Sequence, residues 1–393
     1  MKKVFLFSLF LVLGLVLSQC LPVWLGEAFL TAEKVAKTLM FVCLAFIMIN
    51  VGREFELDKT KWRSYAADYF IAMATAAVPW IMVAFYYMFL LSADLFGNWD
   101  AWKENLLLSR FAAPTSAGIL FTMLAAAGLR REWIYKKTQV LAIFDDLDTI
   151  LLMIPLQIFM IGFKWQLFAV VIVITFLLVI GWKKLGTIRL SQTWKSILFY
   201  AVCIVAVTES IYLLTKWMMG ADGAIHIEVL LPAFVLGMVM KTVHQHGNRD
   251  EKITGMISYL FMFLVGLSTP QFIGIDHGHR ITEAVGIIAA QPMPSWEVLV
   301  VHVIVVTLLS NLGKMFPLFF YRDRQLEERL ALSVGMFTRG EVGAGIIVIA
   351  MGYNLGGPAL IISVLSLVLN LLLTGGFVVI VKRLAQQAYG LKE

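Results

Sequence analysis

The chain has 393 residues, of which 60% are hydrophobic and only 15% are charged, with a formal net charge of +6. Its mean hydropathy is +0.84, whereas soluble domains are about half apolar and about a quarter charged. This composition excludes an ordinary soluble domain and indicates a polytopic helical membrane protein. The positive charge does not indicate nucleic-acid binding, because the basic residues fall in short loops between apolar segments.

Apolar segments long enough to cross a bilayer recur along the whole chain. The first has the basic start of a signal peptide but no small-residue cleavage site, so we interpret it as a span. We predict about twelve spans from apolar length, at Val4–Leu21, Val35–Val51, Ser64–Leu91, Leu107–Gly128, Thr138–Gly162, Trp165–Trp182, Lys195–Trp217, Gly223–Met240, Ile253–Ile273, Glu297–Phe320, Arg329–Tyr353 and Pro358–Val381.

The basic residues predict the orientation of these spans. Most of the 32 Lys and Arg residues fall near the two termini and in every second loop. Loops rich in Lys and Arg stay on the cytoplasmic side. We therefore expect a multi-pass protein of the inner membrane with both termini in the cytoplasm.

Few ionisable side chains lie well inside the predicted spans. They include Asp145, Asp146 and Asp148 in the fifth span, Lys314 in the tenth, and Arg339 and Glu341 in the eleventh. Glu209 and His302 are further candidates, for which ordinary packing positions are the default interpretation. Such residues usually face the interior of the bundle, pair with one another and mark ion or proton pathways. Asp145 and Lys314 both lie roughly 10 Å from the cytoplasmic face, so they can pair if their spans are neighbours.

Two spans contain helix-breaking residues near mid-depth. The fourth contains "RFAAPTSAGIL", with Pro114, Thr115 and Ser116, and the eleventh contains "FTRGEVGAGII". Proline inside a helix removes a backbone hydrogen bond, and the neighbouring hydroxyls offer oxygen ligands. One break alone fits a packing kink. Two breaks in spans of opposite direction, level with buried charges, indicate an inverted-repeat transporter with its site at the midplane.

The aspartates suit a hard monovalent cation, which prefers oxygen ligands and a compensating charge. A carboxylate also binds a proton, and the two cannot occupy it together at full strength. Adjacent helix positions point about 100° apart. One of Asp145 and Asp146 can therefore meet Lys314 while the other faces a cavity.

These segments resemble a known family. "AIFDDLDTI", "AAPTSAGILFTMLAAAG", "SNLGKMFP" and "GMFTRGEVGAGI" are similar, in this order, to the double-aspartate helix, the unwound fourth span, the Gly-Lys element and the Arg-Gly-Glu segment of bacterial monovalent cation:proton antiporters. The double aspartate resembles that of the NhaA-like and NapA-like Na⁺/H⁺ antiporters.

The resemblance implies a role for several residues. Asp146 is the expected carboxylate that alternately binds cation and proton, and Asp145 is the expected ion-pair partner of Lys314. Thr115 and Ser116 are expected to supply oxygens. Pro114, Asp148, Arg339 and Glu341 are candidates for gating or for support of the broken helices; for Arg339 and Glu341, a local pair is an equal alternative.

The resemblance also implies an architecture. It is an all-α fold of about 12 transmembrane helices, in which two broken helices, spans 4 and 11, cross. Residues 1–393 are expected to form one transporter domain, with an ion-translocating core at about 64–162 and 297–381 and scaffold helices that form a homodimer. We expect no soluble regulatory domain and no cofactor, and lipid as the surrounding partner.

The resulting hypothesis is an electrogenic exchanger of Na⁺ or Li⁺ for protons that serves pH homeostasis. A K⁺/H⁺ antiporter is the main alternative, since Na⁺ and K⁺ differ in size and not in ligand type. A cation-coupled symporter for organic anions on a similar fold is a further alternative, although it needs no carboxylate pair balanced by a lysine. The sequence does not favour an enzyme, because the Gly-x-Gly-Asp element of intramembrane aspartyl proteases is absent.

Overall fold

The computed structural model describes most of the chain, at residues 2–25, 28–53, 62–116, 124, 129, 132–161, 172, 176–177, 179–181, 183–184, 186–219, 229–241, 248–268, 286–288, 290–353 and 355–390. These residues are helical apart from turns, short extended stretches and an isolated parallel β-bridge between Ile188 and Met240. The predicted sixth span, Trp165–Trp182, falls largely outside the described residues.

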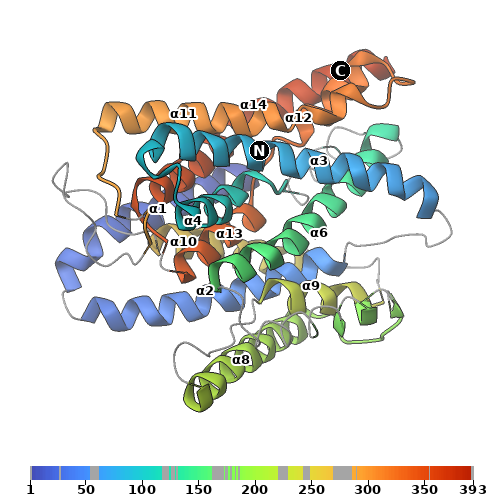
Figure 1. Ribbon diagram of the computed structural model, residues 1–393. Coiled ribbons are helices and arrows are strands. Elements are labelled where there is room, and N and C mark those ends of the chain that lie inside the picture. The colour runs from blue at the N-terminus through green and yellow to red at the C-terminus, as the bar shows by residue number, and fades with distance from the viewer. Residues whose placement is uncertain are drawn as a thin grey trace. The chain divides into compact units, whose positions relative to one another are not determined.

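The helices follow one another with short 3₁₀ or π segments between several of them (Figure 1). Their bounds are α1 Lys2–Leu25, α2 Ala28–Arg53, α3 Trp62–Tyr86, η2 Tyr87–Leu91, η3 Ala93–Leu95, α4 Trp99–Ser109, η4 Arg110–Ala112, α6 Trp133–Ile161, α8 Trp194–Met219, α9 Leu230–Val239, α10 Asn248–Leu267, α11 Trp296–Gly313, η6 Phe316–Phe319, α12 Leu326–Gly335, α13 Glu341–Gly352 and α14 Gly357–Tyr389.

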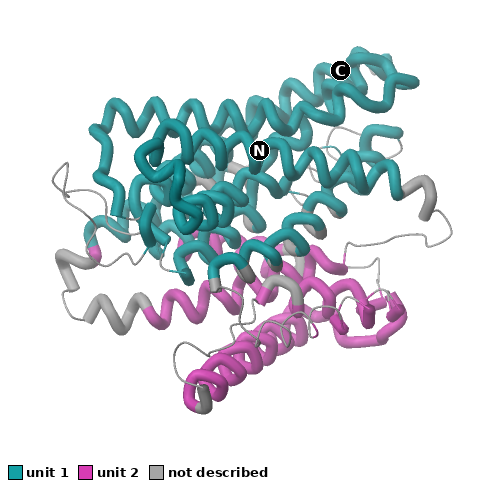
Figure 2. Tube along the Cα trace, viewed as in Figure 1, with its two compact units in different colours: residues 1–20, 60–160, 265–393 teal, residues 21–59, 161–264 magenta. Residues whose placement is uncertain are grey.

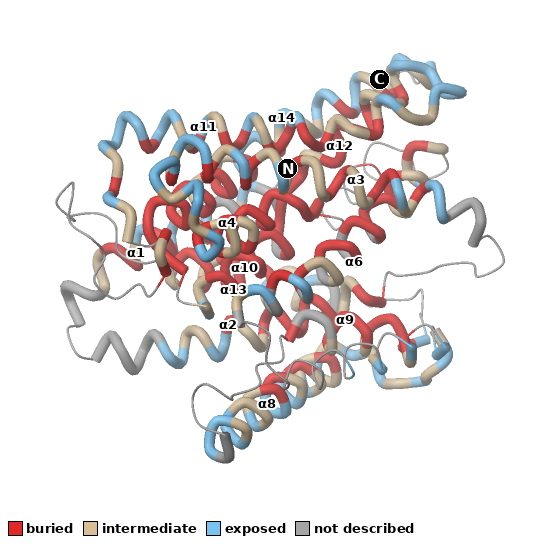
Figure 3. Tube along the Cα trace, in the orientation of Figure 1, coloured by how far each residue is buried: buried red, intermediate tan, exposed pale blue. Residues whose placement is uncertain are grey.

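Several of these helices are suited to a membrane. Within the described residues, five segments are long and apolar enough to cross one, at Lys34–Arg53, Ala66–Leu91, Trp194–Trp217, Trp296–Phe319 and Gly357–Tyr389. Shorter apolar helices include Val342–Gly352, which is buried along nearly all of its length (Figure 3). An all-helical polytopic membrane protein is therefore confirmed.

The chain divides into two compact units (Figure 2). Unit 1 comprises Met1–Cys20, Thr60–Met160 and Val265–Glu393, and unit 2 comprises Leu21–Lys59 and Ile161–Leu264. Within unit 1, α11 packs against α3 and α14. Within unit 2, α2 packs against α8 and α9.

The fourth span begins earlier than its apolar pattern predicts. Helix α4 starts at Trp99 and not at Leu107, because the Asn98 side chain caps it by accepting from the backbone N–H of Asp100. Its first turns carry charges that resemble a loop. The Glu104 carboxylate is nevertheless buried, since it accepts the backbone N–H groups of Ile287 and Ile288 at 2.9 and 2.8 Å.

Both predicted helix breaks are present. The regular helix of α4 ends at Ser109, and after a 3₁₀ turn the chain runs without helix through 113–116. The eleventh span is interrupted between α12, which ends at Gly335, and α13, which begins at Glu341. Two broken helices in spans 4 and 11 are thus confirmed.

Candidate ion-exchange site

Helix α6 carries the carboxylates on a mainly apolar sequence. Asp145 and Asp148 are three residues apart, so they lie on one face of the helix. Both are buried, with 0% and 2% of their surface exposed. Position 146 of the helix is about 100° around from position 145. The side chain of Asp146 lies outside the described part of the chain, as does that of Glu341.

Lys314 reaches Asp145 from the end of another helix. It is the C-terminal cap residue of α11, where the helix dipole favours a positive charge. Its Nζ atom donates to Asp145 Oδ1 at 2.9 Å and to Oδ2 at 2.8 Å, and both side chains are fully buried. The two charges that the sequence places at equal depth are therefore in contact.

Asp148 has a different partner. Arg110 Nη2 donates to Asp148 Oδ2 at 3.2 Å and to the Asp148 backbone carbonyl at 3.0 Å. The guanidinium carbon of Arg110 lies 4.5 Å from the ring centroid of Trp80 on α3, a cation–π distance. Arg110 is fully buried, and its Nε and Nη1 atoms have no hydrogen-bond partner among the described residues.

Arg339 connects the two broken helices. Its Nη1 atom donates to the Pro114 carbonyl at 3.1 Å, and its Nη2 atom donates to the Ser310 carbonyl at 3.2 Å. The Thr115 hydroxyl donates to the Met336 carbonyl at 3.1 Å. Broken helices leave backbone carbonyls without partners, and these donors satisfy several of them. The described contacts of Arg339 are thus with backbone carbonyls of the breaks and of α11.

The two breaks touch directly at their centres. Ser116 N donates to the Thr338 carbonyl at 2.8 Å, and the Thr338 hydroxyl lies 3.4 Å from the Ser116 carbonyl. A Cβ atom on Gly340 would stand 2.5 Å from Ser116 Oγ. Only glycine allows this approach of the two segments, so the break sequence itself sets how closely they cross.

The geometry places several fixed charges around one carboxylate. Asp145 contacts Lys314 and also interacts electrostatically with Arg110 and Arg339. Charges in a medium of low dielectric interact strongly over such distances. A buried carboxylate helix, a lysine and two crossing breaks together form an arrangement that suits a small cation or a proton.

Comparison with known proteins agrees with this arrangement. The profile of the family described as "Sodium/hydrogen exchanger, transmembrane" matches residues 2–384, nearly the whole chain. The chain belongs to this family. The exchanger assignment confirms the resemblance to cation:proton antiporters and the prediction of a transporter and not an enzyme.

The fold of this exchanger is also similar to solved structures. The structure of the sodium proton antiporter MjNhaP1 from Methanocaldococcus jannaschii at pH 8 matches with a TM-score of 0.62 and 13% sequence identity. The match covers 98% of this chain and 92% of that chain. At this identity the likeness shows the fold alone. Among curated proteins, none matches the sequence significantly.

The sequence analysis missed Arg110 although the signal was present. Arg110 is an arginine within an apolar span, but it lies only three residues after Leu107, the predicted start of that span. It therefore resembled a residue near a span end, where long side chains reach water. Because α4 begins at Trp99, Arg110 in fact lies more than two helical turns after the start of this span.

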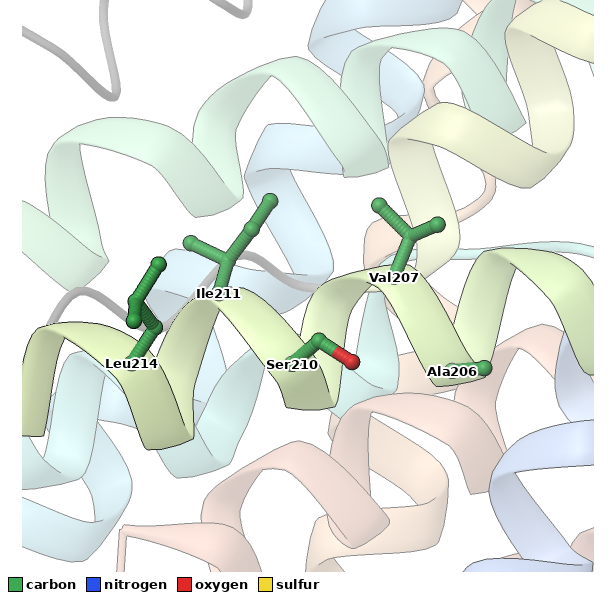
Figure 4. A pocket seen from close by; sticks show the side chains of 5 residues that line it. All are labelled: Ala206, Val207, Ser210, Ile211 and Leu214. Atoms are coloured by element: carbon green, nitrogen blue, oxygen red, sulfur yellow. The ribbon is translucent and has the colours of Figure 1, made fainter.

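An apolar pocket on α8 is separate from these charges. Its lining is Ala206, Val207, Ser210, Ile211 and Leu214, all on one side of the helix (Figure 4). None of these side chains is ionisable, and a membrane cation needs oxygen ligands and a compensating charge. This pocket is therefore not a cation site.

Proposed function

We propose that this exchanger moves Na⁺ or Li⁺ against protons by alternating access, electrogenically, with Asp146 as the shared seat of cation and proton. The single observation that carries the proposal is the fully buried contact between Asp145 on α6 and Lys314 at the end of α11. Charges at such depth are costly unless paired, and functional use is the usual reason for their retention.

The role of Lys314 follows from its contact. A cation that arrives beside Asp145 and Asp146 competes with the Lys314 ammonium for the same carboxylate oxygens. Lysine, unlike arginine, can release its proton when it is buried. Displacement of Lys314 by the cation therefore provides a second exchangeable proton, which supports two protons per cation.

The broken helices supply the remaining ligands in this proposal. Thr115 donates its hydroxyl proton to Met336, so the lone pairs of its oxygen stay available for a cation. Ser116 lies next to it at the crossing. Pro114 presents its carbonyl to Arg339, and Glu341 begins the helix after the second break. We assign Pro114, Arg339 and Glu341 to support of the breaks.

The test uses everted membrane vesicles with an imposed proton gradient. Addition of Na⁺ or Li⁺ should collapse the gradient with the wild-type protein, and Asp146→Asn should abolish the response. Asp323→Asn is the matched control, because Asp323 is exposed and pairs with the neighbouring Arg324. Collapse by K⁺ alone would select the potassium alternative. No response to any monovalent cation between pH 6 and 9, with folded protein, would sink the proposal.

Charge movement is tested in proteoliposomes. An imposed membrane potential should change the rate of Na⁺-dependent proton flux, since one electrogenic cycle moves net charge across the potential. Lys314→Gln should remove the voltage dependence. Indifference of the wild-type rate to voltage would remove the two-proton exchange, and voltage dependence in Lys314→Gln would assign the extra charge elsewhere.

We further propose that residues 64–162 and 297–381 move as the ion-carrying core and that the other helices hold a homodimer in the inner membrane, with both termini cytoplasmic. The division of the chain supports this, because unit 1 contains both ranges except for 161–162. Light scattering of the detergent-solubilised protein measures the oligomeric state. Labelling of terminal cysteines from either side of the membrane measures the orientation.

A further inference from the structure

Arg110 and Asp148 form a second buried ion pair on the same face of α6 as Asp145. Neither takes part in the exchange chemistry proposed above. We propose that they are positioning residues, which hold the unwound segment 113–116 in register with α6 and so fix Thr115 and Ser116 beside the exchanging carboxylates. This inference rests on the proposed function and assigns the part that Asp148 plays in it.

The contact between Arg110 and Asp148 fixes two groups of α6. Arg110 binds both the carboxylate and the backbone carbonyl of Asp148, so it holds the helix backbone as well as a side chain. Arginine is not deprotonated in proteins, so the positive partner of this contact is permanent. Trp80 closes the other side of the guanidinium at 4.5 Å and donates its own indole N–H to the Leu106 carbonyl at 2.7 Å.

The position of Arg110 in the chain gives the contact its effect. Arg110 opens the 3₁₀ turn that leads into the unwound segment, and Arg339 holds the Pro114 carbonyl at the other end. Only the short 3₁₀ turn and Ala113 separate the two anchored positions, Arg110 and Pro114, and Thr115 follows directly. Fixing both ends to neighbouring helices limits where Thr115 can stand.

A ligand role for Arg110 does not fit its surroundings. A permanent positive charge repels a cation, and Arg110 is directed to a carboxylate and an aromatic ring, with no exposed surface. Its effect on exchange must pass through the position of other residues. Loss of such supporting contacts around a metal typically costs about tenfold or more in affinity or activity.

The experiment measures Na⁺-dependent exchange in proteoliposomes for the full chain carrying Arg110→Lys, Arg110→Gln or Asp148→Asn. We expect the apparent KM for Na⁺ to rise about tenfold in Arg110→Gln and Asp148→Asn, with the maximal rate per folded protein little changed. Arg110→Lys keeps the charge but loses the two-pronged contact, so it should recover part of the affinity.

The matched control is another ion pair of α6, which joins this helix to α3. Lys137 lies 2.8 Å from Asp68, near the start of α6 and away from the breaks. Lys137→Gln and Asp68→Asn should leave the KM for Na⁺ unchanged. The wild-type rate separates the two proposals: an inactive wild type contradicts the proposed function. An active wild type with unchanged KM in the Arg110 and Asp148 variants contradicts the positioning role alone.

A purely structural role gives a different result. The maximal rate would then follow the amount of folded protein, with the KM constant, and the Lys137 control would behave like the Arg110 variants; either outcome overturns the inference. If the Arg110 and Asp148 variants do not fold, Trp80→Phe weakens the same contact with less disturbance. We expect it to raise the KM about twofold to threefold, because the cation–π attraction is weaker for Phe than for Trp, and an unchanged KM contradicts the role.

Discussion

The ion-exchange site of unit 1 and the α2–α9 crossing of unit 2 hold their helices together in different ways. At the site, charged side chains reach across helices to carboxylates and to backbone carbonyls, as Arg339 does at Pro114 in the first break and at Ser310 on α11. In unit 2, α2 and α9 meet through glycines, since a Cβ atom on Gly52 or Gly237 would overlap backbone atoms of the other helix. The site is joined largely by polar contacts, and the α2–α9 crossing by close backbone packing.

The polar contacts provide groups for exchange chemistry, and the close backbone packing provides rigidity. A buried ion pair contributes little net stability, because loss of hydration offsets the attraction between the charges. Small residues at helix crossings instead bring backbones close and maximise packing in a membrane. The site therefore retains contacts that can be exchanged for a cation or a proton, while the glycine contacts of the α2–α9 crossing contain no group that can be exchanged.

The largest effect is expected from Gly237→Val in unit 2. The new side chain would overlap the Ile49 carbonyl on α2, which no rotamer can avoid. We expect destabilisation by more than about 4 kcal/mol, in the range of severe steric changes. The melting temperature and folded yield in detergent measure it. Gly255→Ala on α10 is the control, because a Cβ atom there meets nothing within 4 Å; an equal loss in that control would contradict the packing argument.

A smaller and reversible effect is expected in unit 1. Lys314→Met leaves the Asp145 carboxylate buried without its ammonium, which costs about 3–5 kcal/mol. The double variant Lys314→Met/Asp145→Leu should recover most of the melting temperature but no exchange activity. A double variant as unstable as the single one would show that this pair stabilises the fold after all. That result would contradict the contrast between the site and the α2–α9 crossing.

The smallest effect tests the contact between Tyr321, which follows the span Trp296–Phe319, and Asp68 near the start of α3. Tyr321 donates its hydroxyl to Asp68 Oδ1 at 2.8 Å and has a positive φ of 52°. Burial, followed by the negative charge of Asp68, raises the pKa of Tyr321. The folded state therefore keeps this proton when the unfolded chain loses it, so the contribution is complete below pH about 10 and is lost at higher pH.

The variant Tyr321→Phe should lower stability by about 1 kcal/mol at neutral pH and remove part of the alkaline loss seen in the wild type. Thermal melting between pH 7 and 11 measures both. Tyr200→Phe on α8, in unit 2, is the control and should leave the alkaline profile unchanged. Identical profiles for Tyr321→Phe and the wild type would contradict the assigned contact.

The sequence predicted the helices and the breaks well where apolar length and helix-breaking residues determine them. It placed Asp145 and Lys314 at one depth, because depth follows from counting residues along a straight helix. It missed the start of α4, since Asp100, Lys103 and Glu104 resemble a loop until their partners are known. The partner of Glu104 is a pair of backbone N–H groups far along the chain.

The contacts of Arg339 could not be predicted for a related reason. A backbone carbonyl is present at every residue, so nothing in the sequence distinguishes Pro114, Ser310 or Met336 as acceptors. Pro114 and Met336 are acceptors because helical hydrogen bonds are lost around each break, and Ser310 lies in the last turn of α11, where carbonyls also lack helical partners. The roles assigned to Asp146 and Glu341 stay predictions, since their side chains lie outside the described residues.

The ion pairs of Asp148 and Asp145 on α6 also differ in when they can form during synthesis. Arg110 precedes Asp148 by 38 residues, so it is already made when α6 emerges. Lys314 follows Asp145 by 169 residues, which takes roughly 10–30 s at ordinary rates of translation. Helix α6 therefore enters the membrane when the partner of Asp148 is already present and the partner of Asp145 is not yet made. A nascent chain stopped before α11 should remain in contact with the insertion machinery, because its release into lipid would leave the Asp145 carboxylate in the membrane without Lys314.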